Sequence, residues 1–206
     1  MKILFQGDSI TSSGRSREDD NNVGWGYTNL VKSRLSLDYP QKFEFVNRGI
    51  AGNTVADLYA RKVRDIIGVD PDFMSILIGT NDYPWSPNAK FQNRFEKVYN
   101  MLIEEVLEDR PNIKIMLMEP FVLPGSAVQG EAYTVRRKGT EDRSMAVQRI
   151  AEKFGLDFVP LQYLMDEALE KAPVDYWTTE GVHPTPPAFQ IIADEWIKAF
   201  KKIYEL

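Results

Sequence analysis

The chain has 206 residues, of which 43% are hydrophobic and 12% aromatic, and this is enough apolar material for one sizeable core. We therefore expect a single domain over residues 1–206. Thirty acidic against 25 basic residues give a net charge of −5, and no basic run is longer than Arg136-Arg137-Lys138. Nucleic acid and an anionic membrane are therefore not expected as partners. The absence of cysteine excludes disulfides, a cysteine nucleophile and zinc-thiolate sites.

The apolar start of the chain is short. It runs from Met1 to Phe5 and breaks at Gln6-Gly7-Asp8, well before it reaches the length of a secretory h-region. No other apolar run approaches the length of a transmembrane helix. Together these features predict a soluble, cytoplasmic protein.

Short apolar runs alternate along the chain with longer segments of helical periodicity, a pattern typical of a parallel sheet with helices on both faces. The near-continuous apolar character of the short runs fits strands that are buried from two sides. The predicted elements are, in chain order, a strand over Lys2–Gln6, a helix over Tyr27–Leu37, a strand over Phe43–Asn47, a helix over Thr54–Asp65, a strand over Phe73–Ile78, a helix over Lys90–Glu108, a strand over Lys114–Met118, a helix over Glu141–Phe154, a strand over Asp157–Val159, and helices over Leu161–Glu170 and Pro187–Tyr204. Long loops are predicted over Ser12–Gly26 and Phe121–Gly139. The order indicates an α/β fold with a five-stranded parallel sheet.

Residues suited to catalysis follow the predicted strands. Ser9 comes after the first strand, Gly52 after the second and Asn81 after the third, while His183 precedes the last helix. Ligands of a doubly wound sheet bind beyond the carboxyl ends of its strands, so these residues are expected to meet there. His183 is the only histidine. A serine nucleophile needs a base that is effective near neutral pH, and that base would have to be His183.

Each of these residues also has an ordinary structural explanation. Asp8 can cap a short helix, Gly52 can supply an unusual backbone dihedral, and Asp57 can complete a capping box with Thr54. Asn81 can be an ordinary turn residue that hydrogen-bonds the nearby backbone. A histidine before a proline can be an ordinary surface or core residue with no catalytic role. Their joint occurrence in this order, at the strand ends of one sheet, is much less expected by chance.

Four segments together resemble the sequence blocks of the SGNH hydrolases, also called the GDSL esterase and lipase family. The segments are Gly7-Asp8-Ser9-Ile10, Asn47-Arg48-Gly49-Ile50-Ala51-Gly52-Asn53-Thr54, Gly79-Thr80-Asn81-Asp82 and Gly181-Val182-His183-Pro184-Thr185. One block alone would be weak evidence for the family, whereas four blocks in the same order are strong evidence. The four blocks span residues 7 to 185. The resemblance implies a flavodoxin-like, three-layer α/β/α fold and ester hydrolysis through an acyl-serine.

Carried over residue by residue, the resemblance implies that Ser9 is the nucleophile and His183 the base. The backbone amides of Ser9 and Gly52 and the side-chain amide of Asn81 would form the oxyanion hole. Donors placed in advance around the developing negative charge lower the barrier of acyl transfer. A glycine at position 52 would also keep a side chain away from the acyl group.

The third member of the triad departs from the family pattern. The family usually has an aspartate three residues before the histidine, and this chain has Glu180. Glutamate performs this role in other hydrolase triads, so the first hypothesis is that Glu180 orients His183. In a second, a backbone carbonyl orients the ring and Glu180 faces solvent. Asp175 is a further candidate carboxylate.

The stretches Gly7–Arg15, Gly24–Tyr27, Asn47–Leu58 and Ser75–Gly79 look most similar to bacterial acetyl esterases that act on xylan and its oligosaccharides. Trp85 and Trp177, with the adjacent Tyr176, are expected near the site and could stack on sugar rings. They could equally form the apolar wall of an acyl pocket. Asp8, beside the nucleophile, is also expected to contact substrate.

These observations predict a serine esterase that hydrolyses short, O-acetyl esters on carbohydrates such as xylo-oligosaccharides. The alternatives are a lysophospholipase or thioesterase of the same fold and a non-catalytic carbohydrate-binding relative. No cofactor and no metal is expected, because there is one histidine and Glu18-Asp19-Asp20 lacks the spacing of a calcium loop. The expected partner is a small-molecule ester, with no nucleic acid and no membrane. The sequence leaves homo-oligomer formation open.

Overall fold

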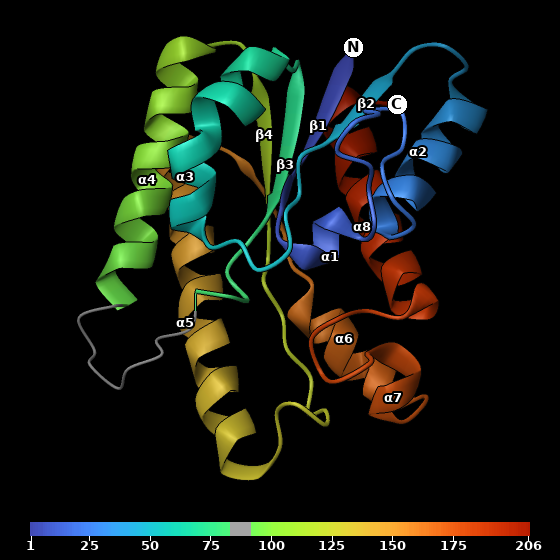
Figure 1. Ribbon diagram of the computed structural model, residues 1–206, viewed down its shortest axis with the longest axis vertical. Helices are drawn as coiled ribbons and strands as arrows, with labels where there is room; N and C mark the ends of the chain where they lie inside the picture. Colours follow the sequence, from blue (N-terminus) through green and yellow to red (C-terminus); the bar gives the residue numbers. More distant parts are fainter. Residues whose placement is uncertain (83–91) are drawn as a thin grey trace.

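A central parallel sheet lies between two layers of helices in the computed structural model, which describes residues 1–82 and 92–206 (Figure 1). The strands are β1 (Lys2–Gly7), β2 (Glu44–Asn47), β3 (Phe73–Leu77), β4 (Lys114–Met118) and β5 (Asp157–Val159). Their order is β2-β1-β3-β4-β5, with every neighbouring pair parallel. This is the flavodoxin-like order, in which the direction of winding reverses between β1 and β3. The predicted three-layer α/β/α fold with five parallel strands is confirmed.

The helices divide into two layers. On one face of the sheet lie α3 (Val55–Asp65), α4 (Gln92–Asp109) and α5 (Gly130–Phe154), and on the other lie α2 (Tyr27–Asp38), α6 (Gln162–Leu169) and α8 (Pro186–Tyr204). The described part of the chain also contains three short elements, namely α1 (Ser9–Ser12), the 3₁₀ helix η1 (Ile67–Val69) and α7 (Val174–Trp177). Segments of three or four residues show no periodicity, so the sequence indicated α1 only through a capping residue and did not predict the other two.

Alternation along the strands builds two hydrophobic cores. In β1, Ile3 and Phe5 face the α2 and α8 layer, whereas Leu4 faces α3, α4 and α5. All three are fully buried. Trp196 and Phe200 of α8 pack on the first of these cores, and their rings stack 5.0 Å apart. These aromatic side chains of the last helix therefore serve to pack it against the sheet.

The helix expected from Glu141 begins earlier, at Gly130, so the predicted loop over Phe121–Gly139 ends near its middle. This first part contains the helix formers Glu131, Ala132 and Arg136-Arg137-Lys138. Arg137 also donates to both Glu141 and Asp166, which ties this part of the helix to α6. Gly139 does not interrupt the helix. The predicted start of the third helix at Lys90 lies outside the described residues.

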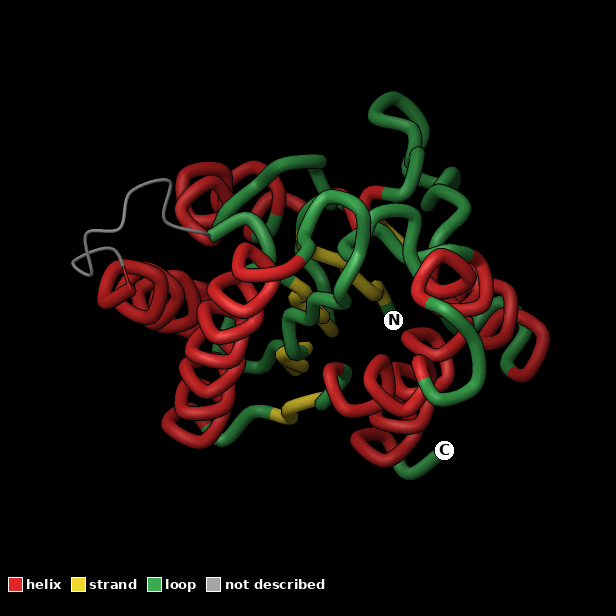
Figure 2. The backbone as a smooth tube through the Cα atoms, turned by 90° about the horizontal axis from the view of Figure 1, so that it is seen from below, coloured by secondary structure: helices red, strands yellow, loops and turns green. Residues whose placement is uncertain are grey.

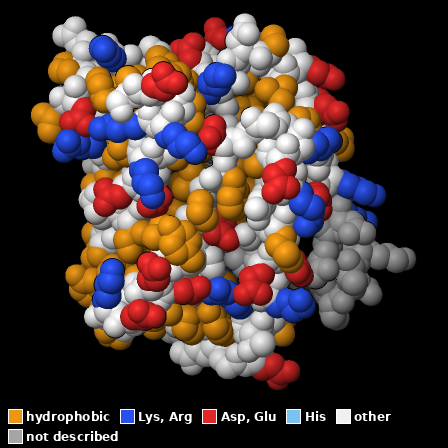
Figure 3. All heavy atoms as spheres, turned by 180° about the vertical axis from the view of Figure 1, so that it is seen from behind, with side chains coloured by type: hydrophobic (Ala, Val, Ile, Leu, Met, Phe, Trp, Pro, Cys, Tyr) orange, Lys and Arg blue, Asp and Glu red, His pale blue; other side chains and the backbone are white. Residues whose placement is uncertain are grey.

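The loops that follow the strands gather at one end of the sheet. Figure 2, seen from below, shows them lying across the carboxyl ends of the strands. On the face opposite to that of Figure 1, acidic and basic side chains are interspersed among apolar patches (Figure 3). None of the helices in the described part of the chain is long and apolar enough to cross a membrane.

Candidate active site

Ser9 stands at a sharp turn from β1 into α1. Asp8 caps this helix, and its Oδ1 accepts a hydrogen bond of 3.0 Å from the backbone N–H of Ile10. The turn requires Gly7, because a Cβ there would lie 2.3 Å from Thr11 Oγ1 and 2.4 Å from the carbonyl oxygen of Leu77. The turn leaves Ser9, the first residue of α1, half-buried at the carboxyl end of the sheet.

His183 reaches Ser9 from a loop 174 residues away in the chain. Its Nε2 lies 2.8 Å from Ser9 Oγ. Its Nδ1 is hydrogen-bonded to Glu180 Oε1, which also accepts the backbone N–H of His183 at 3.1 Å. An Nδ1–H donated to a carboxylate leaves the lone pair of Nε2 directed at the serine hydroxyl, which is the tautomer that a general base requires.

Glu180 accommodates its additional methylene by folding back onto its own loop. Besides the contacts with His183, its Oε2 accepts a hydrogen bond from Thr179 Oγ1. Partial burial would by itself raise the pKa of Glu180, but the hydrogen bonds from Thr179 and His183 outweigh it and lower the pKa below its usual range. The arrangement has the geometry of the first hypothesis. Asp175 instead lies exposed in the first turn of α7.

A second loop clamps the Glu180 loop through the backbone. Leu123 donates its N–H to the carbonyl of Gly181 at 2.8 Å, and Ala127 donates to the carbonyl of Glu180 at 3.2 Å. Between them, Gly125 touches the peptide that joins Glu180 and Gly181, because a Cβ on Gly125 would lie 2.2 Å from the carbonyl carbon of Glu180. Sequence reasoning missed this role. The only signal was the Pro124-Gly125-Ser126 turn in a predicted loop.

Gly52 occupies a turn beside the nucleophile. Asn53 donates its N–H to the carbonyl of Ile50 at 3.2 Å, and Gly52 has a φ of +78°, which suits the third position of a type II turn. A Cβ at Gly52 would meet nothing within 4 Å, so open space faces it. Among the described residues, the backbone N–H groups of Ser9 and Gly52 have no hydrogen-bond acceptor.

The side-chain amide of Asn81 lies between the segments that carry Ser9 and Gly52. Its Nδ2 donates to the carbonyl of Asn53 at 3.1 Å and lies 3.4 Å from Asp8 Oδ2. It therefore touches the neighbour of Gly52 and the neighbour of Ser9. The contact with Asp8 is long, so one N–H of the amide is available to a stronger acceptor. The structure thus places Asn81 in contact with the residues that adjoin Gly52 and Ser9.

Two carboxyl groups, of which Asp8 is buried and Asp82 half-buried, support this end of the sheet. Asp82 accepts the backbone N–H of Val55 at 3.1 Å, and burial raises its pKa to about 6. Asp8 is 1% exposed, and burial, reinforced by the charge of Asp82, raises its pKa to about 7 against the effect of the Ile10 N–H. Because Asp8 is buried, it offers little surface to a substrate, and its contacts are with α1 and Asn81.

The expected aromatic contacts differ in exposure. Trp177 is 8% exposed and belongs to the core, and its Nε1 donates to the carbonyl of Ala172 at 3.1 Å. The adjacent Tyr176 is 53% exposed and meets Trp177 edge to face. Trp85 lies outside the described residues. Tyr176, rather than Trp177, therefore presents an aromatic surface next to the Glu180 loop.

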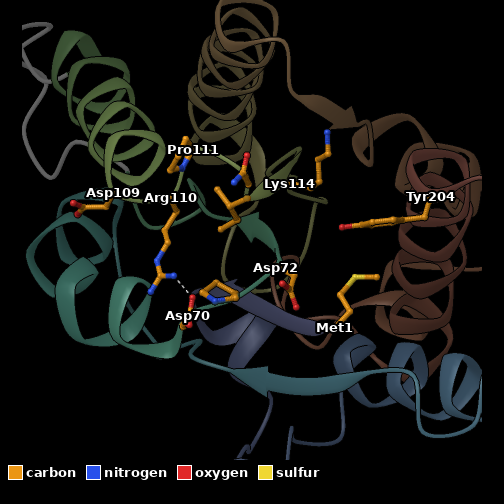
Figure 4. A pocket seen from close by; sticks show the side chains of 11 residues that line it. Met1, Asp70, Asp72, Asp109, Arg110, Pro111, Lys114 and Tyr204 are labelled. Carbon is orange, nitrogen blue, oxygen red and sulfur yellow. Dashed lines mark hydrogen bonds and ion pairs between the residues drawn. The ribbon is translucent and has the colours of Figure 1, made fainter.

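A cavity of about 650 Å³ lies at the other, amino-terminal end of the strands (Figure 4). Met1, Asp72, Lys114 and Tyr204 are among its lining residues, and Asp70 and Arg110 form an ion pair within it. It is separate from the Ser9 site, which lies at the carboxyl end. In the described ranges, no three His, Asp or Glu side chains are grouped so that they could hold a metal ion.

Comparison with known proteins shows the family of the chain. The model of the GDSL-like lipase/acylhydrolase family matches residues 5–191. An acetylxylan esterase of Geobacillus stearothermophilus is 34% identical over 208 residues, which cover 96% of this chain and 92% of that protein.

Solved structures of similar proteins share the fold. A putative GDSL-like lipase of Parabacteroides merdae superposes with a TM-score of 0.88 at 34% identity, covering 96% of this chain and 94% of that one. Axe2, an acetylxylan esterase of G. stearothermophilus, superposes with a TM-score of 0.82 at 33% identity, covering 96% and 93%. The chain therefore belongs to the GDSL-like lipase/acylhydrolase family and is a carboxylic ester hydrolase.

Proposed function

We propose that this esterase removes O-acetyl groups from carbohydrates, in particular from short xylo-oligosaccharides, through an acyl-serine intermediate. The observation that carries the proposal is the chain of contacts from Glu180 through His183 to Ser9, with 2.8 Å between His183 Nε2 and Ser9 Oγ. Such a chain is the arrangement of a serine nucleophile with an oriented base.

In the first half of the reaction, Ser9 Oγ attacks the acetyl carbonyl carbon while His183 Nε2 takes the hydroxyl proton. The carbonyl oxygen becomes an oxyanion and accepts hydrogen bonds from the N–H groups of Ser9 and Gly52 and from Asn81 Nδ2. Glu180 stabilises the imidazolium through Nδ1. The tetrahedral intermediate then collapses, His183 gives its proton to the sugar oxygen, and the deacetylated sugar leaves the acetyl group on Ser9.

In the second half, a water molecule replaces the sugar. His183 Nε2 takes a proton from this water as the water attacks the acetyl carbon, and the same three donors hold the second oxyanion. Collapse of this intermediate breaks the bond to Ser9 Oγ, which recovers its proton from His183. Acetate is released and the free enzyme is restored.

The substrate class is supported by similarity and by exposed aromatic surface. Axe2 is described as an acetyl-xylooligosaccharide esterase, and variants in which its serine or its aspartate is replaced by alanine are described as catalytic mutants. Tyr176, 53% exposed, presents a ring that can stack on the apolar face of a pyranose. The open space at Gly52 leaves room for the acyl group of an ester.

Hydrolysis of 4-nitrophenyl acetate and butyrate by the wild type and by Ser9→Ala tests the proposal. We expect acetate to be turned over faster than butyrate, and the variant to lose both activities. The wild type should then release acetate from acetylated xylo-oligosaccharides. Faster turnover of longer acyl chains would instead favour a lysophospholipase or thioesterase, and turnover that survives Ser9→Ala would refute the assigned nucleophile.

A further inference from the structure

Arginine side chains gather beside the loop that carries Gly52. Four of them line a cavity of about 370 Å³, together with Ile50 and Asp65, and these four are Arg15, Arg17, Arg48 and Arg64. Ile50 stands two residues before Gly52, so their Cα atoms are at most about 7 Å apart. The cavity therefore adjoins the oxyanion loop, and its volume falls in the range of ligand sites, about 300–1,000 Å³.

Two carboxylates form ion pairs with arginines of this cluster, and a third, Asp57, acts on a fifth arginine, Arg61, without a direct contact while it accepts hydrogen bonds from Thr54. Asp20 forms an ion pair with Arg48. Asp65 accepts hydrogen bonds from Arg64 and from Arg61, at 2.7 and 2.8 Å. Burial would raise the pKa of Asp65, but the two guanidinium groups lower it, so Asp65 is ionised.

Five guanidinium groups against three carboxylates leave an excess of two positive charges in a chain whose net charge is −5. Glu18 and Asp19 belong to the same loop as Asp20, but unlike Asp20 they form no ion pair with an arginine of the cluster in the described part of the chain. Positive charge concentrated in a concave site attracts anions.

Arg15 and Arg17 have no carboxylate partner among the described residues. Arg15 is held in place by the carbonyl oxygens of Gly49 and Ser16, at 2.7 and 2.9 Å. Burial and the charges of Arg48 and Arg17 all lower the pKa of Arg15, so the guanidinium groups repel one another. Arg17 is exposed with all of its donors free. An anion bound between them would relieve this repulsion and accept their hydrogen bonds.

We propose that this cavity binds a carboxylate carried by the ester substrate, on a sugar acid joined to the acetylated unit. The inference rests on the proposed function and deepens it, because it adds selection for acidic oligosaccharides to deacetylation. A carboxylate presents two oxygens that match the planar fork of a guanidinium, and such charge-assisted pairs are among the stronger hydrogen bonds in proteins. A phosphate shares this chemistry, so the experiment includes a phosphate-bearing ester.

The test compares KM and kcat at low ionic strength for acetylated xylo-oligosaccharides with and without a uronic acid unit. The variants are Arg17→Gln, Arg64→Gln and their double substitution. Lys114→Gln is the matched control, since it removes the same charge at the opposite end of the sheet (Figure 4). In the wild type and the control we expect KM to be at least about tenfold lower for the acidic substrate, with equal kcat.

The arginine variants should lose this difference while keeping the wild-type KM for the neutral substrate. Equal KM values for both substrates in the wild type would overturn the proposal, as would an undiminished preference in the folded double variant. A lower KM for a short-acyl glycerophosphate ester than for the acidic oligosaccharide would overturn the assignment to a sugar acid. The same preparations are also assayed with 4-nitrophenyl acetate. If they hydrolyse it but show none of the expected KM differences, the carboxylate site is refuted while the proposed esterase function stands.

Discussion

Replacing Gly125 by alanine tests whether the neighbouring loop positions the catalytic histidine. Gly125 does not have a positive φ, so an alanine there causes no backbone strain of that kind, and the effect is steric. The new methyl group would lie 2.2 Å from both the carbonyl carbon of Glu180 and the amide nitrogen of Gly181, whereas ordinary contact begins near 3.4 Å. The Glu180–Gly181 peptide must therefore move by about 1 Å or more.

A displacement of this size has a calculable consequence. A misplacement of about 1 Å in a catalytic group costs roughly 10²-fold in rate. We expect kcat for 4-nitrophenyl acetate to fall by about that factor, with little change in KM, because the displaced loop carries His183 and not the oxyanion donors. Overpacking should also lower the free energy of unfolding by about 1–3 kcal/mol.

Gly130→Ala is the matched control for this substitution. Gly130 is in the same segment and has a φ of +56°, but a Cβ there would meet nothing within 4 Å. This variant should lose some stability and keep its kcat. The assay is steady-state kinetics together with thermal unfolding of both variants. A folded Gly125→Ala enzyme with wild-type kcat would show that the clamp does not position Glu180 and His183.

Three further predictions concern single side chains. Glu180→Gln should lower kcat by about tenfold if only the charge of the carboxylate is lost, and by up to about 10⁴-fold if the imidazole also changes its tautomer. Full activity of this variant would show that Glu180 is not a member of the triad. Asn81→Ala should lower kcat by about 10²- to 10³-fold with the acyl-serine chemistry otherwise intact, as burst kinetics can check. Burial raises the pKa of Asp8 from 3.8 to about 7, so the native state holds a proton that the unfolded chain has released, and the contribution of Asp8 to stability falls as pH rises from about 4 to 7. In urea unfolding, the stability of Asp8→Asn relative to the wild type should grow by up to about 4 kcal/mol over this pH range, and a constant difference would contradict the assignment.

The sequence alone predicted most of the architecture, because its signals are local. Near-continuous apolar runs mark strands buried on both faces, and all five strands lie where these runs are. The capping pair of Thr54 and Asp57 is present, with the backbone N–H of Thr54 donating to Asp57 at 2.8 Å. Helix boundaries were less predictable, since α5 begins at Gly130 through contacts with α6 that no local pattern records.

The order of motifs along the chain identified Ser9, Gly52, Asn81 and His183, because residues that follow parallel strands must share one end of the sheet. Tertiary structure decided everything that depends on residues distant in sequence. The role of Gly125, the burial of Trp177 and the ion pair between Arg48 and Asp20 follow from which segments come into contact. Hydrophobic and propensity patterns report what each residue prefers, whereas contacts across 174 residues, such as that between Ser9 and His183, exist only once the sheet has brought its loops together.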